Sequence, residues 1–394
     1  MRLTRAGASL AVATVPAVVL AWLFGLPELS VLAAAAAVAV ALAAAWVSVR
    51  APRLQVERTA RPPRLAVGEP CEIRLTARNG ATRPTAITTL SDDVGRFGTA
   101  RLVLAPLAPR ARCVATYSLP TPRRGVQHVG PLSCSVEDPF GLARRSIRDP
   151  SIITVMVLPR TWVLDGLPAA PGDEPEHGTH VLSSASTVDE EFAALRDYVP
   201  GDDIRRIHWR STARRGAPVV RQFDVPWQRR TTVLLDQRAG IDDAAFERAV
   251  SAAASVLELV SGRDELVRLV TTAGADSGYV PAAEHLDDLM DSLAVLSTDA
   301  PRRDRPDPLL GTLAELSRTN TSRVVTCTAA VDTGEAAAMP RVTAGIARHL
   351  VVTTGPDAPA LDAGRTIQVR FDGRSGLDVV WRDATRDRTP AAQR

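Results

Sequence analysis

Lysine is absent from the chain, so all 47 residues counted as lysine or arginine are arginines. This absence excludes several chemistries that depend on an amine side chain. A phosphate-binding loop that ends in Gly-Lys-Ser/Thr, a Schiff-base lysine and a kinase-type nucleotide lysine are all impossible here. The abundance of Ala, Arg, Pro and Gly explains the bias by genomic composition, without a functional reason.

Cysteine is scarce, and charge of one sign does not accumulate. The four cysteines form no Cys-x-x-Cys pair and no spacing with paired histidines, so a zinc site has no support; they are Cys71, Cys113, Cys134 and Cys327. We expect them to be small buried side chains in a reducing compartment. The 47 basic and 44 acidic residues leave a net charge of only +3, which disfavours nucleic-acid binding.

Charged residues are also missing from two long N-terminal stretches, residues 6–27 and 29–49, which only Glu28 separates. Each stretch is close to the ~20 residues that cross a bilayer as a helix. The short connection predicts a tight antiparallel hairpin with both outer ends on one side of the membrane. Arginines flank those ends and are missing from the connection; they are Arg2, Arg5, Arg50, Arg53, Arg58, Arg61 and Arg64. The positive-inside rule therefore predicts a two-pass plasma-membrane protein with both termini in the cytoplasm.

A signal peptide over residues 2–24 is the alternative interpretation, with the small residues 33–37 as a cleavage region. The second uncharged run, which follows at once and is itself long enough to span, favours the hairpin.

The next part of the chain, residues 51–160, has the pattern of a β-sandwich-like domain. Apolar and polar residues alternate from Cys71 to Arg78, and Asn79-Gly80 then predicts a turn. Further strands are expected at 101–104, 112–119, 126–129, 132–136 and 152–158, separated by connectors rich in Pro and Gly. Residues 122–125 (Pro-Arg-Arg-Gly) and 138–142 (Asp-Pro-Phe-Gly-Leu) are typical turns.

Residues 161–188 have the composition of a flexible linker, with His177 and His180 as its only groups that titrate near neutrality. A signature segment follows at 189–230, where nine arginines alternate with seven carboxylates. This interleaving favours an internal ion-pair network over a single basic surface. Phe192 and Leu195 are expected on one helical face. Asp202 or Asp203 is expected to cap a short helix that carries Ile207, His208 and Trp209.

The segment Glu191-Phe192, Leu195 to Tyr198, Pro200 to Asp203, Ile207 to Trp209 and Ala213-Arg214 resembles the bacterial family catalogued as domain of unknown function 58. The Arg-Arg-Gly and Asp-Pro-Phe-Gly-Leu turns are similar to that family's as well. The resemblance implies a membrane anchor, a β-sandwich-like part and a C-terminal domain similar to von Willebrand factor A domains. It also implies association with MoxR-type AAA+ ATPases and other membrane proteins, without an established enzymatic activity.

Candidate partner-binding residues therefore come from this segment: Phe192, Arg196, Tyr198, Pro200, Gly201, Asp202, Asp203, Arg205, His208, Trp209 and Arg214. Phe192, Tyr198 and Trp209 are expected to be partly buried. A hydrolase is the alternative, with His208 as base, Asp202 or Asp203 as its orienting acid and Ser211 as nucleophile, because residues three apart on a helix can touch. No nucleophile elbow or oxyanion signal accompanies the pair, so a structural histidine is favoured.

Residues 231–394 alternate strand and helix patterns and predict an α/β, Rossmann-like domain with a mainly parallel sheet and a frayed C-terminus. Strands are expected at 231–236, 265–271, 324–328, 350–353 and 367–371, and helices at 243–261, 284–296, 308–317 and 335–348. Asp236 ends the first strand, at the sheet edge where such domains bind ligands.

A metal-binding von Willebrand factor A domain has Asp-x-Ser-x-Ser at this point, where hard oxygen ligands suit Mg²⁺. Here the sequence is Asp236-Gln237-Arg238-Ala239-Gly240, which lacks both hydroxyls. The site is therefore interpreted as degenerate, with Asp236 as a partner for Arg238 or a capping acid, and no metal or cofactor is expected. The preferred function is a membrane-anchored cytoplasmic adaptor or scaffold without catalysis of its own, which binds a MoxR-type ATPase. No small-molecule substrate is indicated.

Overall fold

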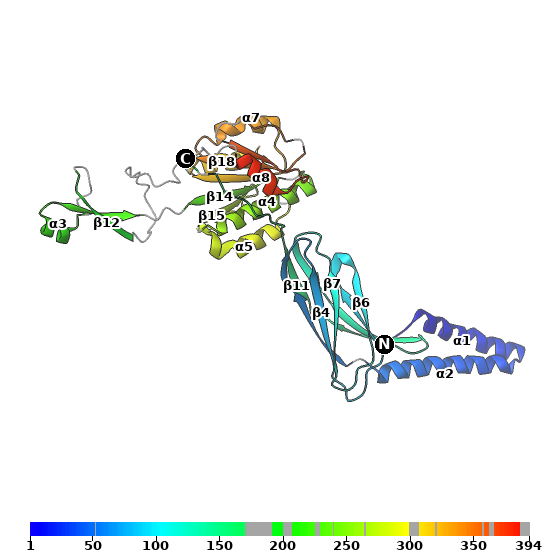
Figure 1. Ribbon diagram of the computed structural model, residues 1–394. Helices are drawn as coiled ribbons and strands as arrows, with labels where there is room; N and C mark the ends of the chain where they lie inside the picture. Colours follow the sequence, from blue (N-terminus) through cyan, green and yellow to red (C-terminus); the bar gives the residue numbers. More distant parts are fainter. Residues whose placement is uncertain are drawn as a thin grey trace. The chain divides into compact units, whose positions relative to one another are not determined.

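The computed structural model describes residues 1–51, 53–168, 170, 191–199, 207–224, 229–238, 240–263, 265–298, 307–319, 321–356, 358–361 and 366–386, and of residues 191–196 and 221–224 it describes the backbone alone. The described residues fall into two compact units (Figure 1). Residues 1–160 together with 290–296 form unit 1, and residues 161–289 together with 297–394 form unit 2. Each unit is described separately.

Two long helices begin unit 1, and they confirm the expected hairpin. Helix α1 (Arg5–Phe24) and helix α2 (Pro27–Val49) run antiparallel, and Gly25 ends α1 with a left-handed φ of 63° (Figure 1). Both helices are long and apolar enough to cross a bilayer. Most of their large apolar side chains are exposed, including Trp22 and Phe24. Such a surface suits lipid better than water.

Unit 1 also contains three β-sheets. Strand order is β1-β10-β9-β5-β6 in the first sheet, β2-β4-β7 in the second and β3-β11-β8 in the third. The strands are β1 (Arg2–Leu3), β2 (Leu54–Arg61), β3 (Arg64–Ala66), β4 (Cys71–Asn79), β5 (Thr88–Asp93), β6 (Thr99–Leu104), β7 (Arg112–Leu119), β8 (Gly125–Val129), β9 (Leu132–Glu137), β10 (Ala143–Asp149) and β11 (Ile153–Leu158). Gly95–Phe97 is a single 3₁₀ turn, and the described residues 53–160 contain no longer helix.

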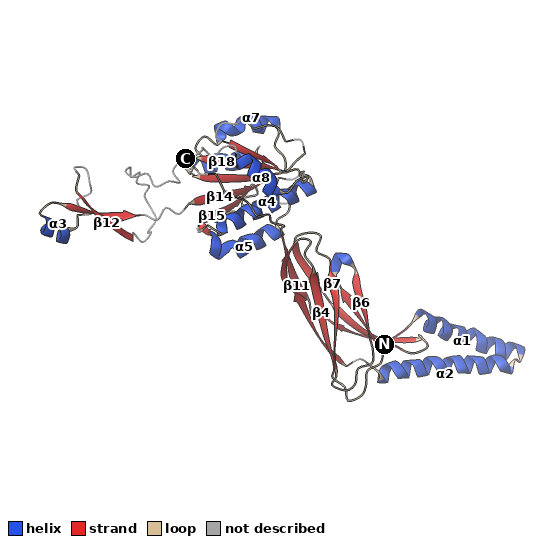
Figure 2. Ribbon diagram, in the orientation of Figure 1, coloured by secondary structure: helices blue, strands red, loops and turns tan. Residues whose placement is uncertain are grey.

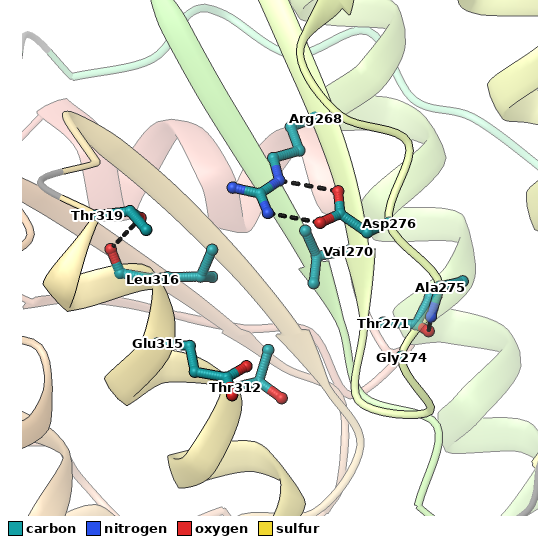
Figure 3. Close-up of a pocket in the computed structure, with 10 residues that line it drawn as sticks. All are labelled: Arg268, Val270, Thr271, Gly274, Ala275, Asp276, Thr312, Glu315, Leu316 and Thr319. Carbon is teal, nitrogen blue, oxygen red and sulfur yellow. Dashed lines mark hydrogen bonds and ion pairs between the residues drawn. The ribbon is translucent and has the colours of Figure 1, made fainter. Parts of the chain in front are cut away.

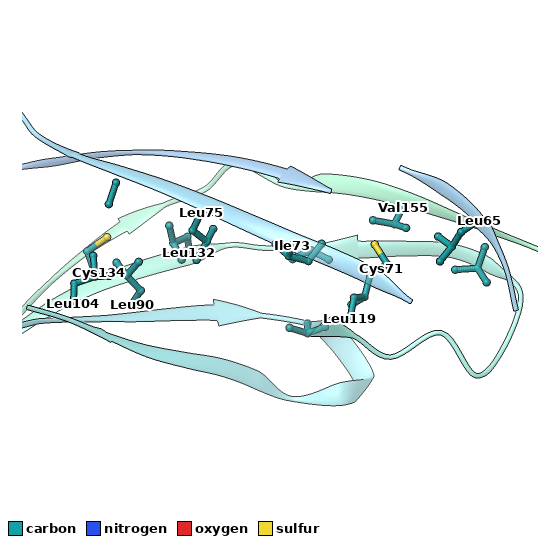
Figure 4. Close-up of a cluster of buried hydrophobic side chains, with 14 residues drawn as sticks. Leu65, Cys71, Ile73, Leu75, Leu90, Leu104, Leu119, Leu132, Cys134 and Val155 are labelled. Atoms are coloured by element: carbon teal, nitrogen blue, oxygen red, sulfur yellow. The ribbon is translucent and has the colours of Figure 1, made fainter. Parts of the chain in front are cut away.

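The core of these sheets is built from alternating strand residues (Figure 4). Cys71, Ile73 and Leu75 on β4 are at most 1% exposed and pack with Leu90 and Leu132. The polar residues between them face outward, as the period-two pattern predicts. Cys71 and Cys134 lie in this core as free thiols, Cys327 is buried in unit 2, and Cys113 is only partly buried. The expectation of small buried cysteines is thus confirmed for three of the four.

Unit 2 contains a six-stranded sheet with the order β16-β15-β14-β17-β18-β19. All neighbours are parallel except the short edge strand β16. The strands are β14 (Arg230–Leu235), β15 (Leu266–Thr271), β16 (Val280–Pro281), β17 (Arg323–Thr328), β18 (Arg348–Thr353) and β19 (Thr366–Arg370). The helices are α4 (Asp243–Ser261), α5 (Ala282–Val295), α6 (Pro308–Arg318), α7 (Thr333–Val342) and α8 (Leu377–Arg386), and the residues of α5 from Met290 on belong to unit 1.

Helices cover both faces of this sheet (Figure 2). Leu309 and Leu313 of α6 and Met339 of α7 pack with Leu234 and Val324 on one face. Helix α4 packs against β14 and β17 on the opposite face, where Ala252, Ala253 and Ala254 are fully buried. Small side chains let this helix approach the sheet closely.

Part of the expected linker instead packs against unit 2. The Trp162 amide donates to Ser255 Oγ at 3.0 Å, and the Trp162 ring meets Phe371 edge-on at 5.1 Å. The Trp381 indole on α8 donates to the Gly166 carbonyl at 2.8 Å and is fully buried. Two tryptophans therefore hold residues 161–166 and α8 in place. At the C-terminal end, residues 387–394 lie outside the described part of the chain. Linker residue 169 and residues 171–188, with His177 and His180, are also outside the described part.

Candidate functional site

The carboxyl ends of the parallel strands bring one cluster of polar residues together in unit 2. Asp236 follows β14, Thr272 follows β15 and Thr328 ends β17. Because β15 and β17 lie on opposite sides of β14, the strand order reverses between β14 and β17. Open α/β sheets bind their ligands at such a reversal.

Asp236 is the centre of this cluster and is completely buried. Its two carboxylate oxygens accept hydrogen bonds from Thr272 Oγ1 at 3.3 Å and Thr328 Oγ1 at 2.8 Å. The Asp236 amide donates to the Cys327 carbonyl at 2.9 Å, which continues the pairing of β14 with β17. The carboxylate is therefore fixed by both neighbouring strands.

Arg238 supplies the positive charge, as the sequence interpretation expected. Its Nε lies 3.0 Å from each oxygen of Asp236, and its Nη2 lies 2.9 Å from Oδ2. The same guanidinium bonds Glu335 through Nη1 and the Ala330 carbonyl through Nη2, the latter at 2.6 Å. Three acceptor groups thus hold one side chain that is 21% exposed. We call Asp236, Arg238, Glu335, Thr272 and Thr328 the arginine lock.

Charge balance explains why the arginine stays ionised. Burial alone lowers the pKa of the Arg238 guanidinium, but hydrogen bonds and charges from Asp236 and then Glu335 outweigh it and raise the pKa above its usual value. The Glu335 carboxylate is itself fixed in a capping box at the start of α7. It accepts from the Asp332 amide at 3.0 Å, and Asp332 accepts from the Glu335 amide at 2.7 Å.

The arginine lock lies at the strand end where the sequence pattern indicates a degenerate metal site. Two carboxylates and two hydroxyls are a donor set that suits Mg²⁺, but here both carboxylates bond the Arg238 guanidinium and both hydroxyls donate to Asp236. No cluster of three or more His, Cys, Asp or Glu residues that could hold a metal occurs among the described residues. The sequence singled out Asp236 and Arg238 but missed Thr272, Thr328 and Glu335. Hydroxyls at the ends of two neighbouring predicted strands, and the Asp-x-x-Glu spacing at 332–335, were the available signals.

A small open pocket of about 130 Å³ lies elsewhere in the same unit, between β15 and α6 (Figure 3). Arg268 at its rim is held by Asp276 in a two-pronged ion pair, and the Tyr279 ring lies 5.7 Å from the guanidinium carbon. The side chain is thus committed to partners within the protein. Thr312 and Thr319, which also line the pocket, donate their hydroxyls to the carbonyls of Pro308 and Leu316, each at 2.8 Å, so they too have partners within the protein.

The signature segment forms a β-hairpin with an inserted helix. Strand β12 (Glu191–Asp197) pairs antiparallel with β13 (Val219–Asp224), with an irregularity between Phe192 and Ala194. Helix α3 (Trp209–Arg215) lies between them and ends at Gly216 with φ 70°. The expectation of a helical face with Phe192 and Leu195 is therefore wrong. Pairing with β13 makes residues 191–197 a strand, and the local sequence pattern does not reveal this contact with a distant segment.

Several signature residues lie outside the described part: Pro200, Gly201, Asp202, Asp203 and Arg205, together with the side chains of Phe192 and Arg196. Tyr198 is half-buried and its amide donates to the Pro218 carbonyl at 2.9 Å, while Arg214 is exposed. Trp209 is 66% exposed, so the expectation of partial burial is wrong for it. Trp209 is the first residue of α3, and no residue of this short helix is buried.

His208 and Ser211 touch, as their spacing allows. His208 Nδ1 lies 2.7 Å from Ser211 Oγ, and both side chains are half-buried. His208 does not belong to the expected helix but precedes it, and Ile207 pairs with Val220 in an isolated bridge. Among the described residues, no hydrogen bond joins His208 Nε2 to a carboxylate, and the expected orienting acids Asp202 and Asp203 lie outside them. The contact is a local one at the start of a short helix.

The chain resembles proteins whose descriptions assign no activity. Uncharacterized proteins of Mycobacterium tuberculosis and Mycobacterium bovis are each 32% identical over 156 residues, which cover 38% of this chain. The match spans 46% of the length of these relatives, so it relates parts of the proteins to one another.

Two solved structures illustrate the structural comparison. The CARDB domain of a Pyrococcus furiosus protein is 16% identical, with a TM-score of 0.21, over 27% of this chain and 91% of that one. A β-glucosidase from Listeria innocua is 12% identical, with a TM-score of 0.16, over 27% and 16%. Residues 194–354 match the family model described as "Protein of unknown function DUF58".

Proposed function

We propose that the chain is a membrane-anchored adaptor that binds protein partners and catalyses no reaction itself. The hairpin α1–α2 would hold it in the plasma membrane with both termini in the cytoplasm, and the two units would present binding surfaces there. In this proposal, unit 1 corresponds to the β-sandwich-like part of the family and the parallel sheet of unit 2 to its von Willebrand factor A-like domain. A MoxR-type AAA+ ATPase is the proposed partner, because the sequence resemblance implies it.

The arginine lock is the observation that carries this proposal. An enzyme of this architecture commonly places its ligand at the carboxyl ends of the strands. Here Arg238 fills that place and satisfies Asp236 and Glu335, so the described residues of the arginine lock offer neither a free base nor an open cation site. Binding through surface side chains remains the simplest use of such a domain.

Among the described residues of the signature segment, exposed Trp209 is the side chain best suited to contact a partner. Tryptophan is enriched among the residues that dominate binding energy, and truncating such a residue costs about 2 kcal/mol or more. Trp209 is 66% exposed on α3, within the hairpin that carries most of the signature. Exposed Arg214 lies on the same short helix.

A binding measurement with purified partners tests the proposal. The detergent-solubilised full chain is titrated with a MoxR-type ATPase from the same organism. We expect saturable binding that Trp209→Ala weakens roughly thirty-fold, which corresponds to about 2 kcal/mol. The matched control is Val163→Ala, which truncates another side chain of unit 2 that is 86% exposed. Equal affinities of wild type and Trp209→Ala would contradict this binding site, and the absence of any complex would contradict the proposed partner.

A hydrolase is the second candidate, because His208 Nδ1 lies 2.7 Å from Ser211 Oγ. The full chain is assayed with a panel of esters and amides beside Ser211→Ala. Turnover that disappears in the variant, with the melting temperature unchanged, would replace the adaptor proposal with a hydrolase.

A further inference from the structure

The Asp138–Leu142 turn of unit 1 is a rigid loop that carries an exposed aromatic side chain. Asp138 is 4% exposed, and its carboxylate accepts hydrogen bonds from the amides of Phe140 at 3.0 Å and Ala143 at 2.6 Å. The Gly141 amide donates to the Asp138 carbonyl at 2.9 Å, and Gly141 has φ 68°. One buried acid thus fixes the turn, yet Phe140 at its tip is 82% exposed.

The base of this turn is attached to the first residues of the chain. Thr4 accounts for two of these contacts: its amide donates to the Leu142 carbonyl at 3.0 Å, and its hydroxyl donates to the Gly141 carbonyl. Strand β1 pairs with β10 directly after the turn, with Leu3 opposite Ala143. A Cβ at Gly7 would lie 2.0 Å from the Leu142 oxygen, so α1 approaches this closely only because residue 7 is glycine.

Helix α2 contacts the same turn through its last turns. Leu142 and Ala143 are buried in a cluster with Ala43 and Val47. Ala43 is six residues before the end of α2 at Val49, which is about 9 Å along a helix axis. Helix α2 has 23 residues and is about 34 Å long, against about 30 Å of hydrocarbon in a bilayer. With the helix centred in the bilayer, Ala43 and Val47 would lie about 7 Å and about 1 Å inside the hydrocarbon, so Leu142 packs in its outer layer, next to the headgroups.

Charge at this end of the hairpin is positive. Arg2, Arg5, Arg50 and Arg53 are all exposed. Glu28 is the only acid in the first 56 residues, and it lies in the first turn of α2, at the other end of the hairpin. Beside the turn, Arg144 pairs with Glu137 at 3.1 Å, and the Asp138 carboxylate is held by backbone amides. Arginines near a bilayer surface are attracted to anionic lipid.

We propose that the Asp138–Leu142 turn is an interfacial anchor that inserts Phe140 among the headgroups of anionic phospholipids, in the leaflet where α1 begins and α2 ends. The inference rests on the proposed membrane anchoring by the hairpin. We take lipid as the partner of Phe140 because the turn is bonded to the start of α1 and packed on the end of α2. This attachment leaves the exposed ring beside the bilayer surface. The anchor fixes the first sheet of unit 1 against the membrane.

Spin labels in the full chain test this placement after reconstitution into vesicles of phosphatidylcholine and phosphatidylglycerol. Cys113→Ser removes the one partly buried thiol, since the other three cysteines are buried. A nitroxide is attached to Phe140→Cys, and its relaxation by lipid-soluble oxygen is compared with relaxation by a water-soluble nickel complex. At position 140 we expect oxygen to relax the nitroxide more than the nickel complex does. This difference should be larger in vesicles with phosphatidylglycerol than in vesicles without it.

Two reference positions separate the anchor from the hairpin. Val38→Cys, in the middle of α2 and 55% exposed, reports on the hairpin. Ile152→Cys, 58% exposed beyond the far end of β10, reports on water. Suppose that oxygen relaxes the label more strongly at position 38, while the nickel complex relaxes the label at position 140 as strongly as at position 152. This result would overturn the anchor and leave the membrane-spanning role of the hairpin intact. A nickel response at all three positions would overturn membrane anchoring and the inference together.

Discussion

Single residues decide the chemistry of the candidate site, and Arg238 is the clearest case. Shortly after the first strand of the parallel sheet ends, this chain places a guanidinium that bonds Asp236 and Glu335. The positive charge at this site is therefore the Arg238 side chain itself. Loss of one partner of a buried ion pair leaves an uncompensated charge.

Replacement of Arg238 by serine is expected to destabilise unit 2 and to create a cation site. We expect a loss of about 3 kcal/mol, the lower end of the range for a buried pair because the arginine is 21% exposed. Calorimetric titration with Mg²⁺ should detect saturable binding in Arg238→Ser and none in the wild type. The oxygens of Asp236, Glu335, Thr272 and Thr328 would be free to coordinate the ion.

The matched control is Arg374→Ser, which removes an arginine that is 90% exposed and pairs with Asp372. An exposed pair contributes about 1 kcal/mol or less, so this variant should neither unfold more easily nor bind Mg²⁺. Equal stability losses in the two variants would contradict the lock.

His349 gives unit 2 a dependence on pH. The side chain is 1% exposed on β18, its Nε2 lies 2.9 Å from Thr326 Oγ1, and burial lowers its pKa to about 3. Because the folded pKa lies below the unfolded value of about 6.5, the stabilisation is present above pH 6.5 and is lost as pH falls toward 3. The slope is at most about 1.4 kcal/mol per pH unit.

Hydrogen exchange of peptides from β17 and β18 measures this effect within the full chain. Protection should fall between pH 6.5 and 4 once the intrinsic exchange rate is corrected for, and His349→Gln should flatten the dependence. His128→Gln, at an exposed position of unit 1, is the control and should leave the dependence unchanged. A slope that persists in His349→Gln would assign it to another group.

At the scale of elements, the contact between α1 and the 138–142 turn depends on one glycine. Gly7→Ala places a Cβ 2.0 Å from the Leu142 oxygen, so the helix and the turn must separate. We expect faster hydrogen exchange at the amides of Thr4 and Ala143, which are bonded at this junction. Ser9→Ala, an equally small change at an exposed position of α1, is the control. Unchanged exchange in Gly7→Ala would show that the junction is looser than the geometry indicates.

At the scale of the whole molecule, the arrangement of charge along the hairpin predicts its orientation. Arginines flank the outer ends, and the connection between α1 and α2 has none. Reporter fusions after residue 394 should be active only in a form that works in the cytoplasm. Fusions after Leu26, in the connection, should be active only in a form that works outside it. Activity of an external reporter after residue 394 would overturn the orientation.

Periodicity alone predicted much of the architecture. The strand expected at 112–119 and the helix expected at 243–261 have the observed bounds, because a period of two or 3.6 sets which face is buried. Strands β2, β5 and β10 were missed. Each carries arginine or aspartate among its apolar residues, which dilutes the alternating pattern. Arg58 and Asp92 show how the sheets accommodate this, since they pair with each other at 3.4 Å inside unit 1.

The sequence by itself determined the two apolar helices, the alternation of strand and helix in unit 2 and the replacement of hydroxyls by Arg238, since each follows from residue type and local spacing. Only the tertiary structure decided that Glu191–Asp197 is a strand, that Glu335 shares the guanidinium with Asp236, and that the 138–142 turn meets the hairpin. Those outcomes depend on partners far away in the chain, and the energy of a contact between distant residues is not encoded in either residue's neighbours.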